Sequence, residues 1–355
     1  MSAEPLLRVE DLHVEFHTED GVVHAVDGID YEVHRGATLG IVGESGSGKS
    51  VAALTTLGLT RNQGASISGR IFFEGRDLAA LSDEELRSIR GNDIAMVFQD
   101  PLSSLHPFFK VGAQLIEAVR THQDVSKAKA RERAIELLSL VGIPDPSRRV
   151  DEFPHEYSGG MRQRAMIAMA LANEPKLLIA DEPTTALDVT VQAQILALLE
   201  RLQQELGMAI VIITHDLGVV AELADDIAVM YAGRIVERTS AELLFSKPEH
   251  PYTWGLLKSL PRLEGSRDEA LVPISGSPPS LINRPSGCHF HPRCPYSQPD
   301  HARIDPKLEP VADGPPHQVA CLLESAVRRR LWAQLQAGRT PEEALASVGA
   351  NGGQP

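Results

Sequence analysis

The sequence has 355 residues, and its 34 basic against 48 acidic side chains give a formal net charge of −14. A chain of this length with 43% hydrophobic residues can bury a substantial core, which argues against a disordered or fibrous protein. The acidic balance argues against a nucleic-acid partner, because phosphate binding needs a basic surface. No apolar run approaches the roughly 20 residues that cross a bilayer. The start of the chain, Met1–Pro5, lacks a secretory signal, so we expect a cytosolic protein.

The predicted elements begin with period-two alternation over residues 6–41, which indicates strands. A glycine-rich turn follows, and residues 83–150 then become helical in character before strands and helices alternate again. The predicted segments in chain order are strands at Leu7–Glu10, Leu12–Phe16 and Leu39–Val42, helices at Ser50–Leu57, Asp83–Arg90, Val111–Arg120 and Ser126–Val141, a strand at Leu177–Ala180, a helix at Val189–Leu206 and a strand at Ala209–Thr214. This order predicts a parallel sheet that is covered by helices and carries a helical insert.

The composition changes towards the C-terminus. Pro261–Pro285 is rich in Pro, Gly and Ser, which is typical of a linker. A Cys/His/Pro-rich module follows at Ser286–Leu322 and contains all three cysteines of the chain. Glu324–Ala346 has the composition of a helix, and we expect Gly349–Pro355 to be frayed.

A glycine-rich segment between a predicted strand and a predicted helix fits the pattern G-x-x-x-x-G-K-[ST]. Its glycines allow the backbone N–H groups to point at phosphate oxygens, and the helix N-terminus adds positive potential. We expect Lys49 to contact the β- and γ-phosphates and Ser50 to ligate Mg²⁺. The expected nucleotide-binding residues are Gly43, Glu44, Ser45, Gly46, Ser47, Gly48, Lys49 and Ser50. The segment therefore predicts a nucleoside triphosphate site.

Two later strands end in residues that would complete this site. Asp181 and Glu182 follow the apolar strand Leu177–Ala180, where Asp181 would hold Mg²⁺ through water and Glu182 would polarise the attacking water. His215 follows the next strand and would contact the γ-phosphate and orient Glu182. Taken alone, the acidic pair also fits an ordinary solvated strand end, and His215 fits a capping or core histidine.

The segment Tyr157–Arg164 resembles the signature of ATP-binding cassette (ABC) ATPases, with Met161 where the commonest form has Gln. The ordered motifs of that family also match, namely Gly43–Ser50, Gln99, Ser158–Met161, Asp181–Glu182, Thr185–Asp188 and His215. The resemblance implies an α/β P-loop ABC ATPase. Its RecA-like parallel-sheet core would carry an antiparallel β subdomain, a helical insert and a small C-terminal extension. The expected domains are an ABC domain at 1–246 with its helical subdomain at about 83–165, an extension at 247–330 and a helical tail at 331–355.

The same resemblance implies that two cassettes close head to tail around ATP. Ser158, Gly159 and Gly160 would then act on the partner's ATP, whereas Lys49 and Glu182 would act on this chain's own. The other site residues implied are Phe16, which would stack on adenine, Gln99, which would sense the γ-phosphate and Mg²⁺, and Asp188. Phe16 also fits a strand core residue, and Gln99 a plain loop residue.

A narrower resemblance concerns the ATPases of oligopeptide and dipeptide importers. It is carried by Lys247–Thr253 and by Phe98–Pro107, which has His106 where that subfamily usually has Asn. Gly43–Gly48 and Ile274–Pro279 are more similar to the D-type subunit than to the F-type.

The importer resemblance implies a peripheral subunit on the cytoplasmic face of the membrane. Its partners would be an F-type ATPase as heterodimer, two permease subunits and, indirectly, an extracytoplasmic binding protein. The same machinery carrying nickel, glutathione or oligosaccharide is an alternative. More remote alternatives are a soluble non-transport ABC ATPase and a small-molecule kinase.

The cysteine module resembles the segment that holds a [4Fe–4S] cluster in D-type subunits, with Cys288, Cys294 and Cys321 at three of the four cysteine positions. The remaining position holds His301. Histidine replaces cysteine at some iron sites, and a Cys₃His set also suits Zn²⁺. The expectation is a structural iron–sulfur cluster, and zinc or a metal-free module remain as alternatives.

Overall fold

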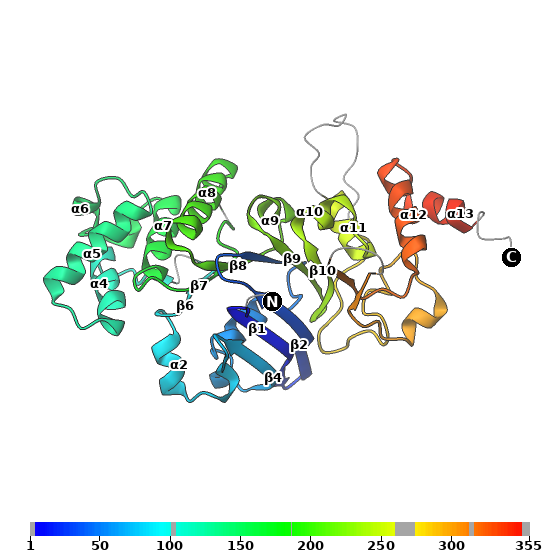
Figure 1. Ribbon diagram of the computed structural model, residues 1–355, viewed down its shortest axis with the longest axis horizontal. Helices are drawn as coiled ribbons and strands as arrows, with labels where there is room; N and C mark the ends of the chain where they lie inside the picture. The colour runs from blue at the N-terminus through cyan, green and yellow to red at the C-terminus, as the bar shows by residue number, and fades with distance from the viewer. Residues whose placement is uncertain (1–3, 101–103, 186, 260–273, 312–315, 350–355) are drawn as a thin grey trace.

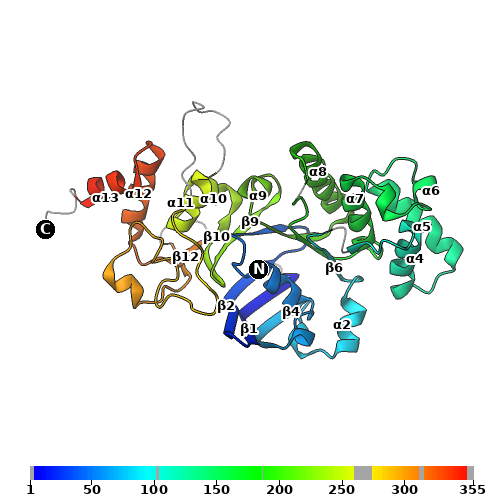
Figure 2. The same ribbon diagram turned by 180° about the vertical axis from the view of Figure 1, so that it is seen from behind.

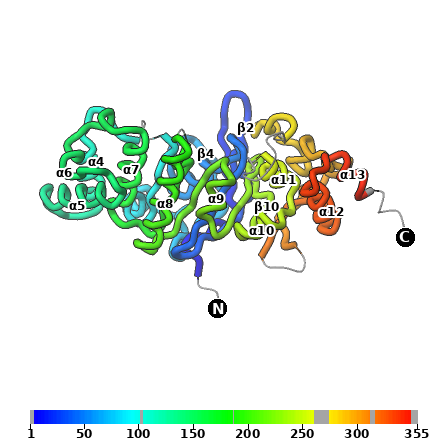
Figure 3. The backbone as a smooth tube through the Cα atoms, turned by 90° about the horizontal axis from the view of Figure 1, so that it is seen from above, coloured from blue at the N-terminus to red at the C-terminus, as the bar shows by residue number. Residues whose placement is uncertain are grey.

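The computed structural model describes residues 4–100, 104–185, 187–259, 274–311 and 316–349. Pro101–Ser103 of the importer-like motif, Ala186, the first part of the expected linker and the end of the expected frayed tail lie outside these ranges. The molecule is elongated, with the helical insert at one end of its long axis and the C-terminal helices α12 and α13 at the other (Figures 1 and 2). The same separation is visible from above (Figure 3).

A four-stranded antiparallel sheet, in the order β2-β1-β4-β5, forms the N-terminal part. Its strands are β1 (Leu7–Thr18), β2 (Gly21–Val33), β4 (Ala65–Phe73) and β5 (Arg76–Asp77). The two strands predicted between residues 7 and 16 form the single strand β1, whose pairing with β2 shifts register between Val9 and Leu12. Asp11, inside that irregularity, has a φ of 46°. A local bulge therefore explains why the alternation is interrupted in the sequence.

An eight-stranded sheet, in the order β11-β12-β10-β9-β3-β8-β7-β6, forms the centre. The strands from β9 to β6 in this order run parallel, whereas β10, β12 and β11 are antiparallel. The bounds are β3 (Thr38–Val42), β6 (Ile94–Val97), β7 (Leu177–Asp181), β8 (Ala209–Thr214), β9 (Asp226–Tyr231), β10 (Arg234–Ser240), β11 (Glu309–Pro310) and β12 (His317–Val319). The parallel order brings the ends of β3, β7 and β8 to one edge of the sheet, which confirms the predicted parallel-sheet core.

The central sheet is buried on both faces. Along β8, Ile210 and Ile212 face one hydrophobic cluster, which contains the helical insert, whereas Val211 and Ile213 face the other cluster, which contains the N-terminal sheet. Successive strand residues point to opposite faces, so a strand covered on both sides has to be apolar throughout. This is why Ala209–Ile213 is a continuous apolar run.

The helices follow the predicted pattern closely. Ser126 caps α5 as expected, because its Oγ accepts a hydrogen bond from the Lys129 N–H at 3.3 Å. In the first part of the chain the helices are α1 (Lys49–Thr56), α2 (Asp83–Ile89), α4 (Val111–His122), α5 (Lys127–Leu140), α6 (Pro146–Arg149), α7 (Gly159–Ala170), α8 (Val189–Leu206) and α9 (Leu217–Leu223). In the last part they are α10 (Ala241–Ser246), α11 (Pro251–Lys258), α12 (Ser325–Gln336) and α13 (Pro341–Gly349). No helix in the described part of the chain is long and apolar enough to cross a membrane.

The C-terminal extension is connected to the central sheet. Its strand β12 pairs with β10, and β11 pairs in turn with β12. Gly338, with a φ of 83°, follows the end of α12, so the helical tail predicted as one segment is two helices. The strands of the extension were not predicted, because they are only two or three residues long.

Candidate functional site

The phosphate-loop segment turns sharply between β3 and α1, and two of its glycines are required by close backbone contacts. A Cβ on Gly43 would lie 2.1 Å from the Met230 carbonyl oxygen, and one on Gly48 would lie 2.2 Å from that of Ala25. Both glycines also have positive φ angles, 157° and 101°. At the turn itself Ser45 and Gly46 are exposed, whereas Ser47 is buried. The loop is thus wedged between two strands and opens to solvent at its tip.

Lys49 is buried under this loop. Its Nζ donates to the carbonyl oxygens of Gly43 at 2.7 Å and Glu44 at 2.9 Å, with the Ser47 Oγ at 3.4 Å. Burial lowers the pKa of Lys49, and the nearby carboxylates of Glu182, Asp181 and Glu44 oppose that shift. The ammonium group is therefore fixed at the centre of the loop.

Ser50 and Asp181 form a direct pair, although 131 positions separate them in the sequence. The Ser50 Oγ donates to the Asp181 Oδ1 at 3.0 Å. Asp181 is the last residue of β7 and is only 5% exposed, and burial raises its pKa, as does the neighbouring Glu182. A hydroxyl and a carboxylate are hard oxygen donors of the kind that Mg²⁺ prefers, so this pair fits a magnesium site.

Glu182 has a φ of 46°, a left-handed conformation that is uncommon outside glycine. Three side chains hold its carboxylate: Gln99 Nε2 donates to Oε2 at 3.0 Å, Thr185 Oγ1 donates to Oε2 at 2.8 Å, and His215 Nδ1 lies 3.2 Å from Oε1. Burial raises the pKa of Glu182, but the hydrogen bonds from Thr185 and His215 outweigh it, so the pKa is lowered. Glu182 is therefore an oriented carboxylate that stays ionised.

Thr185 was not among the residues singled out for a role. It opens the motif Thr185–Asp188, three residues after Glu182 in the loop before α8, and that place is the sequence signal that could have found it. Gln99 was expected to sense the γ-phosphate and Mg²⁺, and in the structure its amide donates to Glu182, beside the Ser50–Asp181 pair. The cluster of expected residues brought together at this edge is Lys49, Ser50, Gln99, Asp181, Glu182 and His215.

The residues of the expected signature lie apart from this cluster. Ser158 caps α7, since its Oγ accepts a hydrogen bond from the Met161 N–H at 3.3 Å, and both Ser158 and Gly159 are exposed. A Cβ on Gly160 would lie 2.8 Å from Val191 Cγ1 in the first turn of α8. Within the described ranges no hydrogen bond or ion pair joins these three residues to the phosphate loop. The N-terminus of α7 thus faces outward and is free of this chain's own site.

Two further expected residues have mainly structural contacts in this chain. Asp188 caps α8, because its Oδ1 accepts a hydrogen bond from the Val191 N–H at 3.0 Å. Phe16 lies on β1 opposite Val23 and Ala65 and is partly buried against the hydrophobic cluster of the N-terminal sheet. The structure places neither residue in contact with Lys49 or Glu182.

The cysteine module does not assemble the expected metal site. Burial raises the pKa of Cys294 to about 12 and that of Cys321 to about 11, and the Cys288 thiol contributes to both increases. His301 is engaged locally, since its Nδ1 accepts a hydrogen bond from the Gln298 N–H at 3.2 Å. Among the described residues, which include all four expected ligands, no group of three or more His, Cys, Asp or Glu side chains is placed to hold a metal ion. The geometry therefore does not support the iron–sulfur or zinc expectation.

Two sequence families match this chain. Residues 26–185 match the family described as ABC transporter, and residues 236–300 match the family described as oligopeptide/dipeptide transporter, C-terminal region. The first match covers the phosphate loop, the signature and Glu182, and the second covers α11 and the first part of the cysteine module, with Cys288 and Cys294.

Relatives and solved structures agree with these matches. The oligopeptide transport ATP-binding protein OppD of Bacillus subtilis (strain 168) is 53% identical over 309 residues, which cover 87% of this chain and 86% of that protein. The dipeptide transport ATP-binding protein DppD of Escherichia coli (strain K12) is 51% identical over 309 residues, which cover 87% and 94%. The dimeric, post-hydrolysis structure of the ATP-binding cassette MJ0796 bound to ADP and Pi has a TM-score of 0.59 at 26% identity, covering 66% of this chain and 98% of that one.

A second solved structure, cbiO1 from Clostridium perfringens, part of the ABC transporter complex cbiONQ, has a TM-score of 0.58 at 32% identity and covers 69% of this chain and 92% of that one. The fold, the clustered site and the similarity across both matched regions agree. This chain belongs to the ABC transporter ATPases, within the group of oligopeptide and dipeptide transport ATP-binding proteins.

Proposed function

We propose that this chain is the ATP-hydrolysing subunit of an ABC importer that takes up peptides across the cytoplasmic membrane. The observation that carries the proposal is the oriented, ionised Glu182 beside the Ser50–Asp181 pair and the buried Lys49. The relatives named above transport oligopeptides and dipeptides, which favours peptides over nickel, glutathione or oligosaccharide.

The chemistry follows from the site. Lys49 would bind the β- and γ-phosphates, and Ser50 and Asp181 would hold Mg²⁺, which supplies positive charge beside the phosphates. Glu182 would accept a proton from the attacking water as general base, and His215 would orient it. Gln99 would link the γ-phosphate to the helical insert, because its amide contacts Glu182 while its chain leads from β6 towards α4. Hydrolysis is in-line attack of water on the γ-phosphorus with ADP as the leaving group.

The second half of each ATP site would come from another subunit. Ser158 and Gly159 are exposed at the N-terminus of α7, where backbone N–H groups are available to an anion. We infer that Ser158, Gly159 and Gly160 contact the partner's ATP and that Phe16 and Asp188 complete this chain's own site on dimer closure. The dimeric MJ0796 cassette supports closure of two such chains. The proposed partner is an F-type ATPase, a second and non-identical chain.

The assembly would lie at the cytoplasmic face of the membrane. Its other members would be two permease subunits and, indirectly, an extracytoplasmic substrate-binding protein. In this assignment residues 1–246 are the ABC domain, with the helical subdomain at about 83–165, residues 247–330 are the extension, and residues 331–355 are its tail.

The proposal on the cysteine module is separate from hydrolysis. We propose Cys288, Cys294, His301 and Cys321 as the candidate ligands of a structural [4Fe–4S] cluster, on the resemblance alone, since the geometry does not support it. Metal and sulfide analysis of anaerobically purified protein decides the matter. Four irons and four sulfides per chain would support the cluster, one zinc would support the zinc alternative, and metal-free protein would contradict both.

The test of the whole proposal is co-purification from the native cell. The tagged chain would be extracted from membranes in mild detergent, and stoichiometric partners would be identified by mass spectrometry. We expect a second ATPase and two polytopic subunits. Soluble partners only, or a homodimer without membrane proteins, would contradict the transporter assignment while leaving the ATPase chemistry in place.

A further inference from the structure

In the described part of the chain, hydrogen bonds from the C-terminal extension reach the phosphate loop at Glu44, the second residue of the loop. The Arg293 guanidinium binds its carboxylate in a bidentate manner, with Nη1 donating to Oε2 at 2.6 Å and Nη2 donating to Oε1 at 3.0 Å. The backbone N–H of Glu44 donates to the Tyr252 hydroxyl oxygen at 2.8 Å. Arg293 and Tyr252 are separated from Glu44 by 249 and 208 positions.

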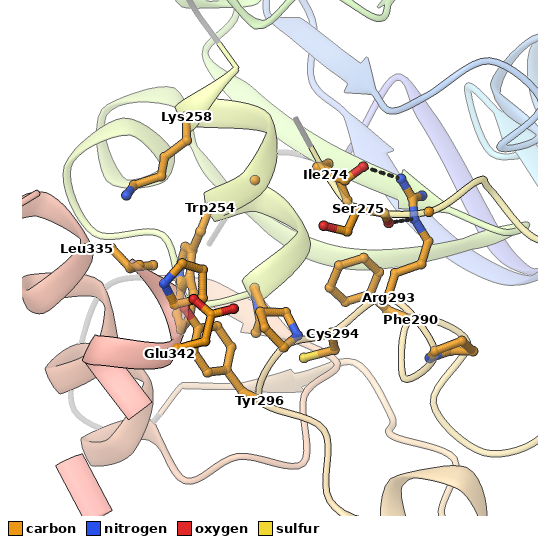
Figure 4. Close-up of a pocket in the computed structure, with 16 residues that line it drawn as sticks. Trp254, Lys258, Ile274, Ser275, Phe290, Arg293, Cys294, Tyr296, Leu335 and Glu342 are labelled. Carbon is orange, nitrogen blue, oxygen red and sulfur yellow. Dashed lines mark hydrogen bonds between the residues drawn. The ribbon is translucent and has the colours of Figure 1, made fainter. Parts of the chain in front are cut away.

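The side chains of both partners of Glu44 are buried and are held in place by contacts within the extension and with the central sheet. The Arg293 side chain is only 5% exposed, and its Nε donates to the Ser275 carbonyl oxygen at 2.9 Å (Figure 4). Tyr252 is fully buried and packs against Tyr231 and Phe290, with ring centroids 4.7 and 5.5 Å apart. The guanidinium also lies 5.8 Å from the Tyr231 ring centroid. The Arg293 guanidinium and the Tyr252 hydroxyl are therefore preorganised to bind Glu44.

Glu44 also connects these contacts to Lys49, the lysine proposed to bind the phosphates. The carbonyl oxygen of Glu44 accepts a hydrogen bond from Lys49 Nζ at 2.9 Å. One residue of the loop thus joins the extension, through the Glu44 N–H and carboxylate, to the Lys49 ammonium group, through the Glu44 carbonyl. A shift of Glu44 would move an acceptor of Lys49.

The charge of Glu44 makes Arg293 more than a packing residue. A carboxylate inside a phosphate loop repels the triphosphate, whose charge has the same sign. The bidentate guanidinium neutralises that carboxylate, and Glu44 in turn raises the pKa of Arg293. Without Arg293, the uncompensated Glu44 would weaken ATP binding but would leave Glu182 and its contacts unchanged.

We propose that Arg293 and Tyr252 are positioning residues of the ATP site, by which the C-terminal extension sets the affinity of the phosphate loop for ATP. This inference rests on the proposed binding of ATP phosphates by Lys49. It assigns to the extension an effect on ATP affinity that is separate from any metal bound by its cysteines.

The test measures ATP hydrolysis by the purified transporter at varied Mg·ATP concentration, and ATP binding without hydrolysis. Arg293→Met is expected to raise the KM for ATP by about tenfold, within the range of coupling between linked sites, with little change in kcat. Adding Glu44→Gln to Arg293→Met is expected to recover at least about threefold of that tenfold loss, roughly half of it on a logarithmic scale, because it removes the uncompensated charge.

Two further variants keep the test decisive. Tyr252→Phe deletes only one hydroxyl and keeps the aromatic packing, so it is expected to raise the KM several-fold even where Arg293→Met does not fold. Asp305→Asn is the matched control. Asp305 is also an extension residue that forms an ion pair with a cassette residue, Arg234, but among the described residues it forms no ion pair with the phosphate loop. Its KM for ATP is expected to stay at the wild-type value.

Wild-type KM in both Arg293→Met and Tyr252→Phe would overturn the inference, as would a fall in kcat alone or a KM defect that Glu44→Gln does not relieve. A wild-type protein that fails to bind ATP would instead contradict the proposed function itself. The two failures are therefore distinguishable in one set of titrations.

Discussion

The nucleotide site and the C-terminal extension are held together in different ways. The nucleotide site gathers residues at the ends of adjacent parallel strands, where β3, β7 and β8 deliver Lys49, Asp181 and His215 to one edge of the sheet. The extension is attached instead by buried charged side chains. Glu237 accepts hydrogen bonds from the His317 ring at 2.8 Å and from the backbone of residues 249 and 250. Within the extension itself, the buried Glu249 binds Arg328 at 2.7 Å.

Because of this difference, a substitution is expected to have different effects in the two regions. Strand order positions the catalytic groups, so a single substitution there changes chemistry without removing the scaffold. A buried ion pair depends on both partners, and loss of one leaves an uncompensated charge in a low-dielectric interior. Substitutions at the nucleotide site are therefore expected to lower the rate of hydrolysis, and substitutions in the extension to lower the free energy of unfolding.

The largest expected effect is on the rate. Glu182→Gln removes the general base but preserves the shape of the side chain, so kcat is expected to fall by at least about tenfold, and by 10²–10⁴-fold if proton transfer is fully lost. ATP binding is expected to persist. Steady-state hydrolysis measures the fall in kcat, and a nucleotide-binding assay measures whether ATP still binds. The control is Glu222→Gln, which changes an exposed carboxylate on α9. Near-normal turnover would show that another group accepts the proton.

The next effect is on stability. Arg328→Met leaves the buried Glu249 with only part of its partners, Arg329 and Ser325, so the free energy of unfolding is expected to fall by about 3 kcal/mol. Denaturant titration measures this change, and kcat per folded molecule is expected to be unaffected. Arg330→Met, on the exposed face of the same helix, is expected to change stability by less than about 0.5 kcal/mol. Equal effects of the two substitutions would contradict the importance of the buried pair.

The smallest effect concerns pH. Burial lowers the pKa of His250 from its ordinary value of 6.5 to about 3, while its Nδ1 caps α11 by accepting the Tyr252 N–H at 3.0 Å. Between these pH values the unfolded chain binds a proton that the folded chain does not. The stabilisation is therefore complete above about pH 6.5 and is lost as pH falls towards 3, by about 1.4 kcal/mol per pH unit.

His250→Asn keeps a side-chain oxygen that can cap α11 but cannot titrate in this window. Its free energy of unfolding is expected to depend less steeply on pH between 6.5 and 4.5 than that of the wild type. His34→Asn, an exposed histidine, is expected to leave the slope unchanged. An identical slope for His250→Asn and the wild type would show that this histidine does not stay neutral in the folded protein.

The sequence predicted the cassette well because its motifs are local and the sheet topology brings them together. Gly43–Ser50 and Asp181–Glu182 each follow an apolar strand, and parallel strands place such ends side by side. The hydrogen bonds from Gln99 and Thr185 to Glu182 required coordinates, because both depend on the loop conformation around Glu182.

The extension was predicted less well, for a physical reason. The cysteine spacing predicted a metal site. The contacts that attach this region to the cassette are instead pairs such as Glu44–Arg293 and Glu237–His317, which no local sequence pattern indicates. Short strands such as β12 have too few residues to show alternation. Long-range pairing of single charged residues cannot be deduced from one sequence.

Hydrolysis at Glu182 is proposed to drive peptide uptake, and one measurement tests this coupling directly. The transporter would be purified with its membrane subunits, reconstituted in liposomes with its binding protein and supplied with a labelled peptide and Mg·ATP. We predict that peptide stimulates ATP hydrolysis, that peptide accumulates only with ATP, and that Glu182→Gln abolishes both. Hydrolysis that peptide leaves unchanged, or uptake that persists in Glu182→Gln, would contradict the account.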